Sequence, residues 1–146
     1  MIVDKLLLFS NKQDLTQAQA GSPTPSVNTV DFSQARDFGP TEGFKVFVEF
    51  SSLPIGAAGT TLSIAVQISI DNQNWTTLED FPSIDITTLT NSQPFAVRAK
   101  PAFSNMIYRY MRLTYTPSQT LSSGIVMAGI NLDVPSQQAY PKNYVA

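Results

Sequence analysis

The feature that most constrains the fold of this chain is the alternation of apolar and polar residues along several short segments. In FKVFVEF (44–50), one set of alternate residues is wholly apolar, and the same period of two returns from Leu62 onward. Successive side chains of a β-strand point to opposite faces of the sheet, so the pattern predicts strands with one buried face. Five segments carry it: 44–50, 62–70, 95–100, 108–116 and 125–134.

The same alternation predicts the core. Within each segment we expect the apolar set to point inward and its neighbours to point outward. The expected core residues are Phe44, Val46, Val48, Phe50, Leu62, Ile64, Val66, Ile68, Ile70, Phe95, Val97, Ala99, Met111, Leu113, Tyr115, Val126, Ala128, Ile130, Leu132 and Val134.

Weaker signals complete an all-β pattern. Segments 2–9, 27–32 and 75–78 are predicted as shorter strands, and proline or glycine separates most of the strands. A single helical turn is expected within 84–89, and no longer helix. About eight antiparallel strands with long loops predict a two-sheet sandwich, with Greek-key or jelly-roll connections.

The 146 residues are enough for one domain with a substantial core. We expect that domain to span residues 1–134. The segment QAQAGSPTPS (17–26) is small, polar and proline-containing, which predicts a flexible loop. The segment PSQQAYPKNYVA (135–146) cannot continue the last strand, and it is predicted to be an extended C-terminal tail.

Composition excludes several kinds of chemistry. The chain has no cysteine and no histidine, so it has no Ser-His-Asp or Cys-His nucleophile and no thiolate or imidazole metal site. We therefore expect no enzyme activity, no cofactor and no small-molecule substrate. A net charge of −2 without a basic run argues against nucleic acid. The chain has no apolar run of membrane-spanning length and no readable signal peptide, which indicates cytoplasmic synthesis and no membrane partner.

Apolar residues at expected outward positions are the candidate interface. A monomer rarely exposes a large contiguous apolar patch, and aromatic residues and Met are enriched at protein interfaces. The alternative is that the segments 10–30 and 135–146 fold back and cover these residues. The candidates are Phe47, Tyr108, Tyr110, Ile125 and Met127, together with Tyr140 and Tyr144 in the tail.

The stretch SIDNQNW (69–75) is close to an Asp box, a hairpin in which an aspartate braces the turn and a tryptophan packs behind it. Here Gln73 replaces the central glycine, and Trp75 arrives one residue early. Asp71 and Asn72 favour a turn through side-chain bonds to the backbone, and Asn tolerates a positive φ. Trp75 is expected to cover one end of the core, and the alternative is an exposed stacking site for a sugar.

Two groups of charged residues each allow several interpretations. The carboxylates Glu79, Asp80 and Asp85 are either loop residues that aid solubility, weak calcium ligands or a glycosidase-like pair. The cations occupy two predicted strands, where they indicate a solvated face, a surface complementary to an acidic partner, or a platform for single-stranded nucleic acid. These cations are Arg98, Lys100, Arg109 and Arg112.

Three stretches carry a resemblance to a known family, and together they cover nearly the whole chain. They are MIVDKLLLFSNKQDLT (1–16), VDFSQARDFGPTEGFKVFVEF (30–50), and LSIAVQISIDNQNWTTL (62–78) with its continuation through YRYMRLTYT (108–116) and GIVMAGINLD (124–133). In these stretches the chain resembles the small jelly-roll capsid cement (decoration) proteins of short-tailed phages, of the Bordetella-phage type.

This resemblance implies a jelly roll without enzymatic activity that sits on the outer capsid surface of a virion. There it would form a homodimer, bridge subunits of the major capsid protein and stabilise the expanded shell. In Ala35-Arg36-Asp37, Arg36 is a candidate shell contact, with a local ion pair as the alternative. The competing function is a carbohydrate-binding β-sandwich of a phage tail or host-attachment structure.

Overall fold

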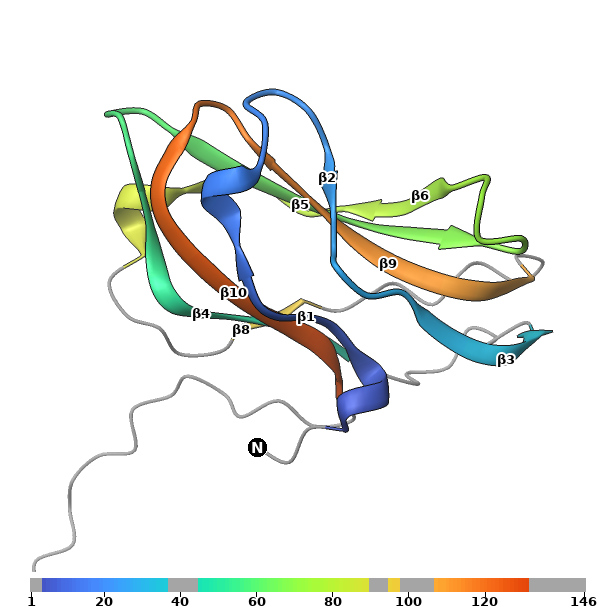
Figure 1. Cartoon of the computed structure of the whole chain (residues 1–146). Coiled ribbons are helices and arrows are strands. Elements are labelled where there is room, and N and C mark those ends of the chain that lie inside the picture. The colour runs from blue at the N-terminus through green and yellow to red at the C-terminus, as the bar shows by residue number, and fades with distance from the viewer. Residues whose placement is uncertain (1–3, 37–44, 90–94, 98–106, 132–146) are drawn as a thin grey trace, which may run out of the picture.

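The computed structural model describes residues 4–36, 45–89, 95–97 and 107–131, which form two antiparallel β-sheets packed face to face (Figure 1). The expected tail 135–146, with Tyr140 and Tyr144, lies outside the described residues. The strands are β1 (Leu8–Asp14), β2 (Thr24–Pro25), β3 (Val30–Arg36), β4 (Lys45–Gly56), β5 (Thr61–Ser69), β6 (Thr76–Asp80), β7 (Ile84–Asp85), β8 (Phe95–Val97), β9 (Tyr108–Pro117) and β10 (Leu121–Asn131).

The strand order is that of a jelly roll. The four-stranded sheet has the order β1-β10-β4-β8, and the six-stranded sheet has the order β2-β9-β5-β6, with β3 beside β9 and β7 beside β5. Since β5 pairs along β9 from Tyr110 to Pro117, both β2 and β3 must use the opposite edge of β9, where they form one interrupted strand. By the same reasoning, β6 and β7 form one interrupted strand along β5. If each interrupted strand is counted once, the described residues form eight strands. Numbered along the chain, these strands have the order 1-8-3-6 in one sheet and 2-7-4-5 in the other, which confirms the expected sandwich.

Three short 3₁₀ turns connect the strands, and an aspartate begins each. They are η1 (Lys5–Leu7), η2 (Leu15–Gln17) and η3 (Ile86–Thr88), with Asp4, Asp14 and Asp85 at their N-caps. Each carboxylate accepts a hydrogen bond from the backbone N–H two residues later, which would otherwise lack a partner. The η3 turn confirms the helical turn expected within 84–89.

The core fills the space between the two sheets, and it contains every expected residue whose side chain the structure describes, apart from Ile70. Side chains outside that description are those of Phe44, Phe95, Val97, Ala99, Leu132 and Val134. On β4, β5, β9 and β10 the inward residues include Val48, Val66, Leu113 and Val126, all fully buried. Ile70 is an exception, because β5 ends at Ser69 and Ile70 is 63% exposed in the following turn. That prediction was wrong.

Tyr108 is a second exception. It was expected to point outward, yet it is buried in the core with its ring edge-on to Phe32, at a centroid distance of 6.1 Å. Tyr108 and Met111 are both buried although they are three residues apart, so the alternation of β9 changes phase between them. The β3–β9 pairing has a register shift at the same place, between Asp31 and Arg36.

A chain of hydrogen bonds joins the two sheets at one edge. The Ser10 hydroxyl donates to Gln13 Oε1 over 2.7 Å, so the buried Tyr115 hydroxyl donates to Ser10 Oγ over 2.8 Å. Gln13 in turn accepts from the backbone N–H of Val27 and donates to the carbonyl of Pro25. No buried side-chain nitrogen or oxygen in the described ranges lacks a hydrogen-bond partner.

The segment 17–26, predicted as a flexible loop, is attached along β9. Ala18 is buried, the N–H of Gly21 donates to the carbonyl of Pro117, and the N–H of Ser26 donates to the carbonyl of Leu113. Through β2 and these bonds the segment covers the edge of β9. Covering an edge strand removes a template for unwanted pairing with other chains.

A second, smaller apolar cluster lies on the outer face of the four-stranded sheet. Phe47 points away from the main core, as expected, but Leu8 and Met127 pack against it and it is fully buried. Phe47 was therefore wrongly expected to be available for contacts. Gly129 lies beneath this cluster, paired with both Leu8 and Phe47.

Gly129→Ala is expected to destabilise the fold. The added Cβ would lie 2.8 Å from the carbonyl oxygen of Leu7 and 3.0 Å from both Leu8 Cδ2 and Phe47 Cε1. Since backbone must move to relieve the contact, we expect a loss of about 1–3 kcal/mol in the free energy of unfolding, measured by urea titration. Ser51→Ala, at an exposed position of β4, is the control; equal midpoints for both variants would contradict the close packing.

The β5–β6 turn has the geometry predicted for it. Asp71 accepts hydrogen bonds from the backbone N–H groups of Gln73 and Asn74, from the Ser69 hydroxyl and from the Asn74 amide. Asn72 has a φ of 62°, in the left-handed region that Asn tolerates. The four bonds hold the pKa of Asp71 well below its ordinary value, led by the bond from the Asn74 backbone.

Asp71→Ala is expected to lower the melting temperature at pH 7, because the turn loses its acceptor. A carboxylate with a lowered folded pKa stabilises the fold above its ordinary pKa of 3.8, and this contribution is lost as the pH falls through the folded value. The difference between wild type and variant should thus shrink in acid. Thermal unfolding between pH 2 and 7, with the exposed Asp80→Ala as control, measures it; a difference that grows in acid would refute this role.

Candidate interface on the six-stranded sheet

The outer face of the six-stranded sheet is polar and carries little charge. Up to Ile68, the outward residues of β5 are only partly buried and alternate with buried ones. After its phase change β9 follows the same rule, except that Thr114 is buried. The outward set comprises Ser63, Ala65, Gln67, Tyr110, Arg112 and Thr116.

An arginine stacked on the single tryptophan is the most distinctive feature of this face. The guanidinium carbon of Arg112 lies 4.1 Å from the centroid of the Trp75 ring. Its Nε donates to Gln67 Oε1 over 2.9 Å, across the β5–β9 pair in which the two residues are directly opposite. Cation–π contact and the hydrogen bond together fix the plane of the guanidinium.

Trp75 is therefore neither a core residue nor an open platform. It precedes β6, is half-buried, and belongs to neither apolar cluster, so the expectation that it covers one end of the core was wrong. The residue that packs on it is Arg112, from a strand more than thirty residues later in the sequence. Partial burial against the ring also lowers the pKa of Arg112.

The neighbouring Arg109, unlike Arg112, forms an ion pair with a carboxylate. Its Nε and Nη2 donate to the two carboxylate oxygens of Asp31 over 2.7 and 2.9 Å, which ties β3 to β9. This bidentate pair lowers the pKa of Asp31. The guanidinium also lies 5.0 Å from the ring centroid of Tyr110, which is half-buried. By contrast, no carboxylate of the described residues forms an ion pair with Arg112.

The eight residues proposed from the sequence do not form one surface. Tyr110 lies on the outer face of the six-stranded sheet, whereas Ile125 and Met127 are half-buried on the four-stranded sheet. Phe47 and Tyr108 are fully buried. The backbone of Arg36 pairs with that of Tyr108, but its side chain, like Tyr140 and Tyr144, lies outside what the structure describes.

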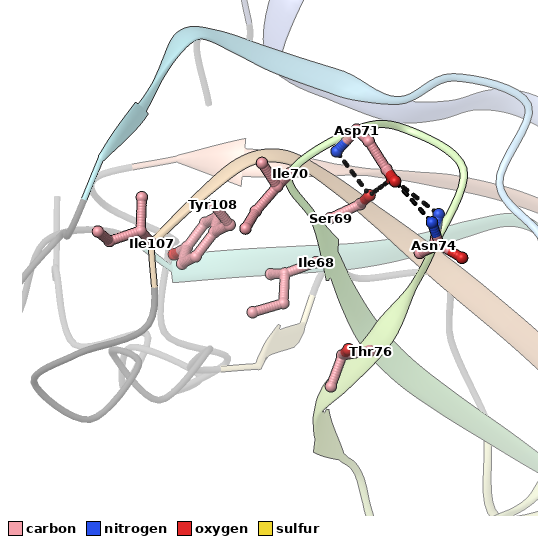
Figure 2. Close-up of a pocket in the computed structure, with 8 residues that line it drawn as sticks. All are labelled: Ile68, Ser69, Ile70, Asp71, Asn74, Thr76, Ile107 and Tyr108. Atoms are coloured by element: carbon pink, nitrogen blue, oxygen red, sulfur yellow. Dashed lines mark hydrogen bonds between the residues drawn. The ribbon is translucent and has the colours of Figure 1, made fainter.

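The sequence prediction missed two hollows in the described part of the chain, of which the larger is mainly apolar. Figure 2 shows the larger one, where Ile70 from the β5–β6 turn and Ile107 before β9 flank a space of about 550 Å³. These two side chains are 63% and 53% exposed. The smaller hollow, about 380 Å³, lies between η1 and residues 27–29 and is flanked by the exposed Leu6 and Val27. Single isoleucines at strand ends carry no periodic signal, so alternation alone does not find them.

The carboxylates considered from the sequence do not converge. Asp85 caps η3, and Glu79 and Asp80 are adjacent on β6, so their side chains leave opposite faces of the sheet. Within the described ranges, no three acidic side chains are grouped so that they could hold a metal ion. The described residues also include no helix long and apolar enough to cross a membrane.

The fold is a jelly-roll domain, and the outer face of its six-stranded sheet is largely polar. The profile of the Bbp16 family matches residues 9–130, most of the chain, and the protein belongs to that family. The family name is of the kind given to Bordetella phage proteins, which agrees with the phage resemblance of the N-terminal stretches. No curated protein matches the chain.

Removing Arg112 is expected to uncover Trp75. In Arg112→Ala the ring loses the guanidinium that lies 4.1 Å above it, so acrylamide should quench its fluorescence more efficiently. Because Trp75 is the single tryptophan, the signal reports this site alone. Arg109→Ala, which removes the cation over Tyr110 instead, should leave the quenching constant unchanged; an equal rise in both variants would argue against the stack.

Proposed function

We propose that this protein is a non-enzymatic capsid cement protein of a phage. It binds the outer surface of the head, bridges subunits of the major capsid protein and stabilises the expanded shell. The observation that carries the proposal is the outer face of the six-stranded sheet, where Trp75, Arg112 and Tyr110 lie on one rigid surface. Tryptophan, tyrosine and arginine are the residue types that dominate the energy of protein–protein contacts.

The rest of the molecule supports this function. Membership of a phage protein family restricts the setting, and a two-sheet sandwich with a continuous core is a stiff body that transmits load between its contacts. A ligand that binds only the expanded shell stabilises that state by mass action. Many identical copies on one shell turn a modest contact into a large total effect, and a homodimer doubles the valency of each unit.

The alternative function is sugar binding, and the observation that favours it is the half-buried Trp75. A sugar-binding face uses an aromatic ring as a platform, but a guanidinium already packs on this ring. The two functions differ in a simple measurement, because a saccharide that stacks on Trp75 would quench its fluorescence and a cement protein has no such ligand.

Co-sedimentation with empty, expanded shells of the parent phage tests the proposal. We expect saturable, stoichiometric pelleting of the purified protein and a higher disruption temperature of the decorated shells. Unexpanded shells are the matched control and should bind less, since the proposal requires preference for the expanded state. A folded protein that fails to pellet with expanded shells, combined with saccharide-dependent quenching of Trp75, would favour the sugar-binding function instead.

A further inference from the structure

We infer that Arg112, held against Trp75, is a receptor for a carboxylate on the outer surface of the shell protein. This inference rests on the proposed cement function and adds the chemistry by which one face of the sheet recognises its partner. It commits to a single partner, an aspartate or glutamate side chain of the major capsid protein.

The hydrogen bonds of Arg112 leave its outer edge available. A guanidinium has five N–H donors in a planar fork. Only Nε is used, toward Gln67, and neither Nη group has a partner among the described residues. Two Nη groups in one plane are the arrangement that binds both oxygens of a carboxylate side by side.

Trp75 and Gln67 preorganise this fork. A free arginine on a surface loses several rotatable bonds when it binds, and that entropy opposes the contact. Here the stack on Trp75 and the bond to Gln67 have already restricted the side chain in the unbound protein. Binding then costs less entropy, and the half-buried ring excludes water from one side of the guanidinium.

Arg109, on the same strand, is an arginine whose charge is compensated by a carboxylate of this chain. Asp31 takes its Nε and Nη2 in a two-point contact, so its charge is already compensated inside the chain. Arg112, three residues later, has an aromatic ring and a neutral amide where Arg109 has a carboxylate. No described carboxylate of this chain pairs with Arg112, and we assign that role to a carboxylate of the major capsid protein.

The charge of the chain favours a protein carboxylate over the phosphates of a nucleic acid. Nucleic-acid binding relies on several cations acting together along the backbone. This chain has a net charge of −2, and the nearest cation to Arg112 on β9 is compensated by Asp31. A single preorganised arginine matches a local acidic side chain on a protein surface.

The test compares two variants that each remove one positive charge. Arg112→Gln removes the fork from the six-stranded sheet, and Lys45→Gln removes an exposed cation from the four-stranded sheet. In co-sedimentation with expanded shells we expect the apparent Kd of Arg112→Gln to rise at least about tenfold. Lys45→Gln should bind within about twofold of wild type, and Arg112→Lys should be intermediate because it keeps the charge but loses the planar fork.

Footprinting adds a readout that does not depend on substitution. Hydroxyl-radical oxidation of wild-type protein, read by mass spectrometry, should show Trp75 protected on the shell relative to the free protein. Melting temperatures of all variants show whether each is folded before binding is compared.

The outcomes separate the inference from the proposed function. A large loss of binding in Arg112→Gln together with protection of Trp75 supports both. If wild type pellets but Arg112→Gln binds equally well, or Trp75 stays as reactive as in the free protein, the carboxylate receptor is refuted and the cement function stands. If wild type does not pellet at all, the cement function is refuted and the inference falls with it.

Discussion

The packing of two inner sheet faces against each other is the interaction on which the rest of this structure depends. Apolar residues such as Phe50, Ile64 and Leu113 leave water together, and no other contact in the described chain buries as much apolar surface. That packing sets the register of each strand, because a slip by one residue would turn its buried set outward. It also brings Tyr115 close enough to Ser10 for the hydrogen bond that links the sheets.

The outer faces follow from this arrangement, and they differ from each other. On the four-stranded sheet, Leu8 and Met127 cover Phe47, so its apolar residues are used within the chain. On the six-stranded sheet the outward residues remain small and polar, apart from Tyr110 and the Trp75–Arg112 stack. The shell-binding role that we propose is therefore assigned to the six-stranded sheet, where the Nη groups of Arg112 have no partner among the described residues.

Local pattern predicted much of the architecture but little of the site. The alternation along β4, β5, β9 and β10 identified most core positions, since each inward residue repeats with the period of the strand. Tyr108 was wrongly predicted to point outward because residue types do not reveal the change of phase in β9. Ile70 was wrongly predicted to be in the core because β5 ends one residue before it. Trp75 was misplaced for a different reason: its partner, Arg112, is distant in sequence and becomes its neighbour only when β9 pairs with β5.

The sequence by itself determined the class of fold, the turn at Asp71 and the absence of thiolate and imidazole groups. Each of these depends on residue type or on a short sequence period, so it can be predicted without knowing which distant residues become neighbours. The tertiary structure alone decided which outward residues are covered, which arginine is compensated and which remains available. Those outcomes depend on long-range strand pairing, because Phe47 needs Leu8, Arg109 needs Asp31 and Arg112 needs Trp75.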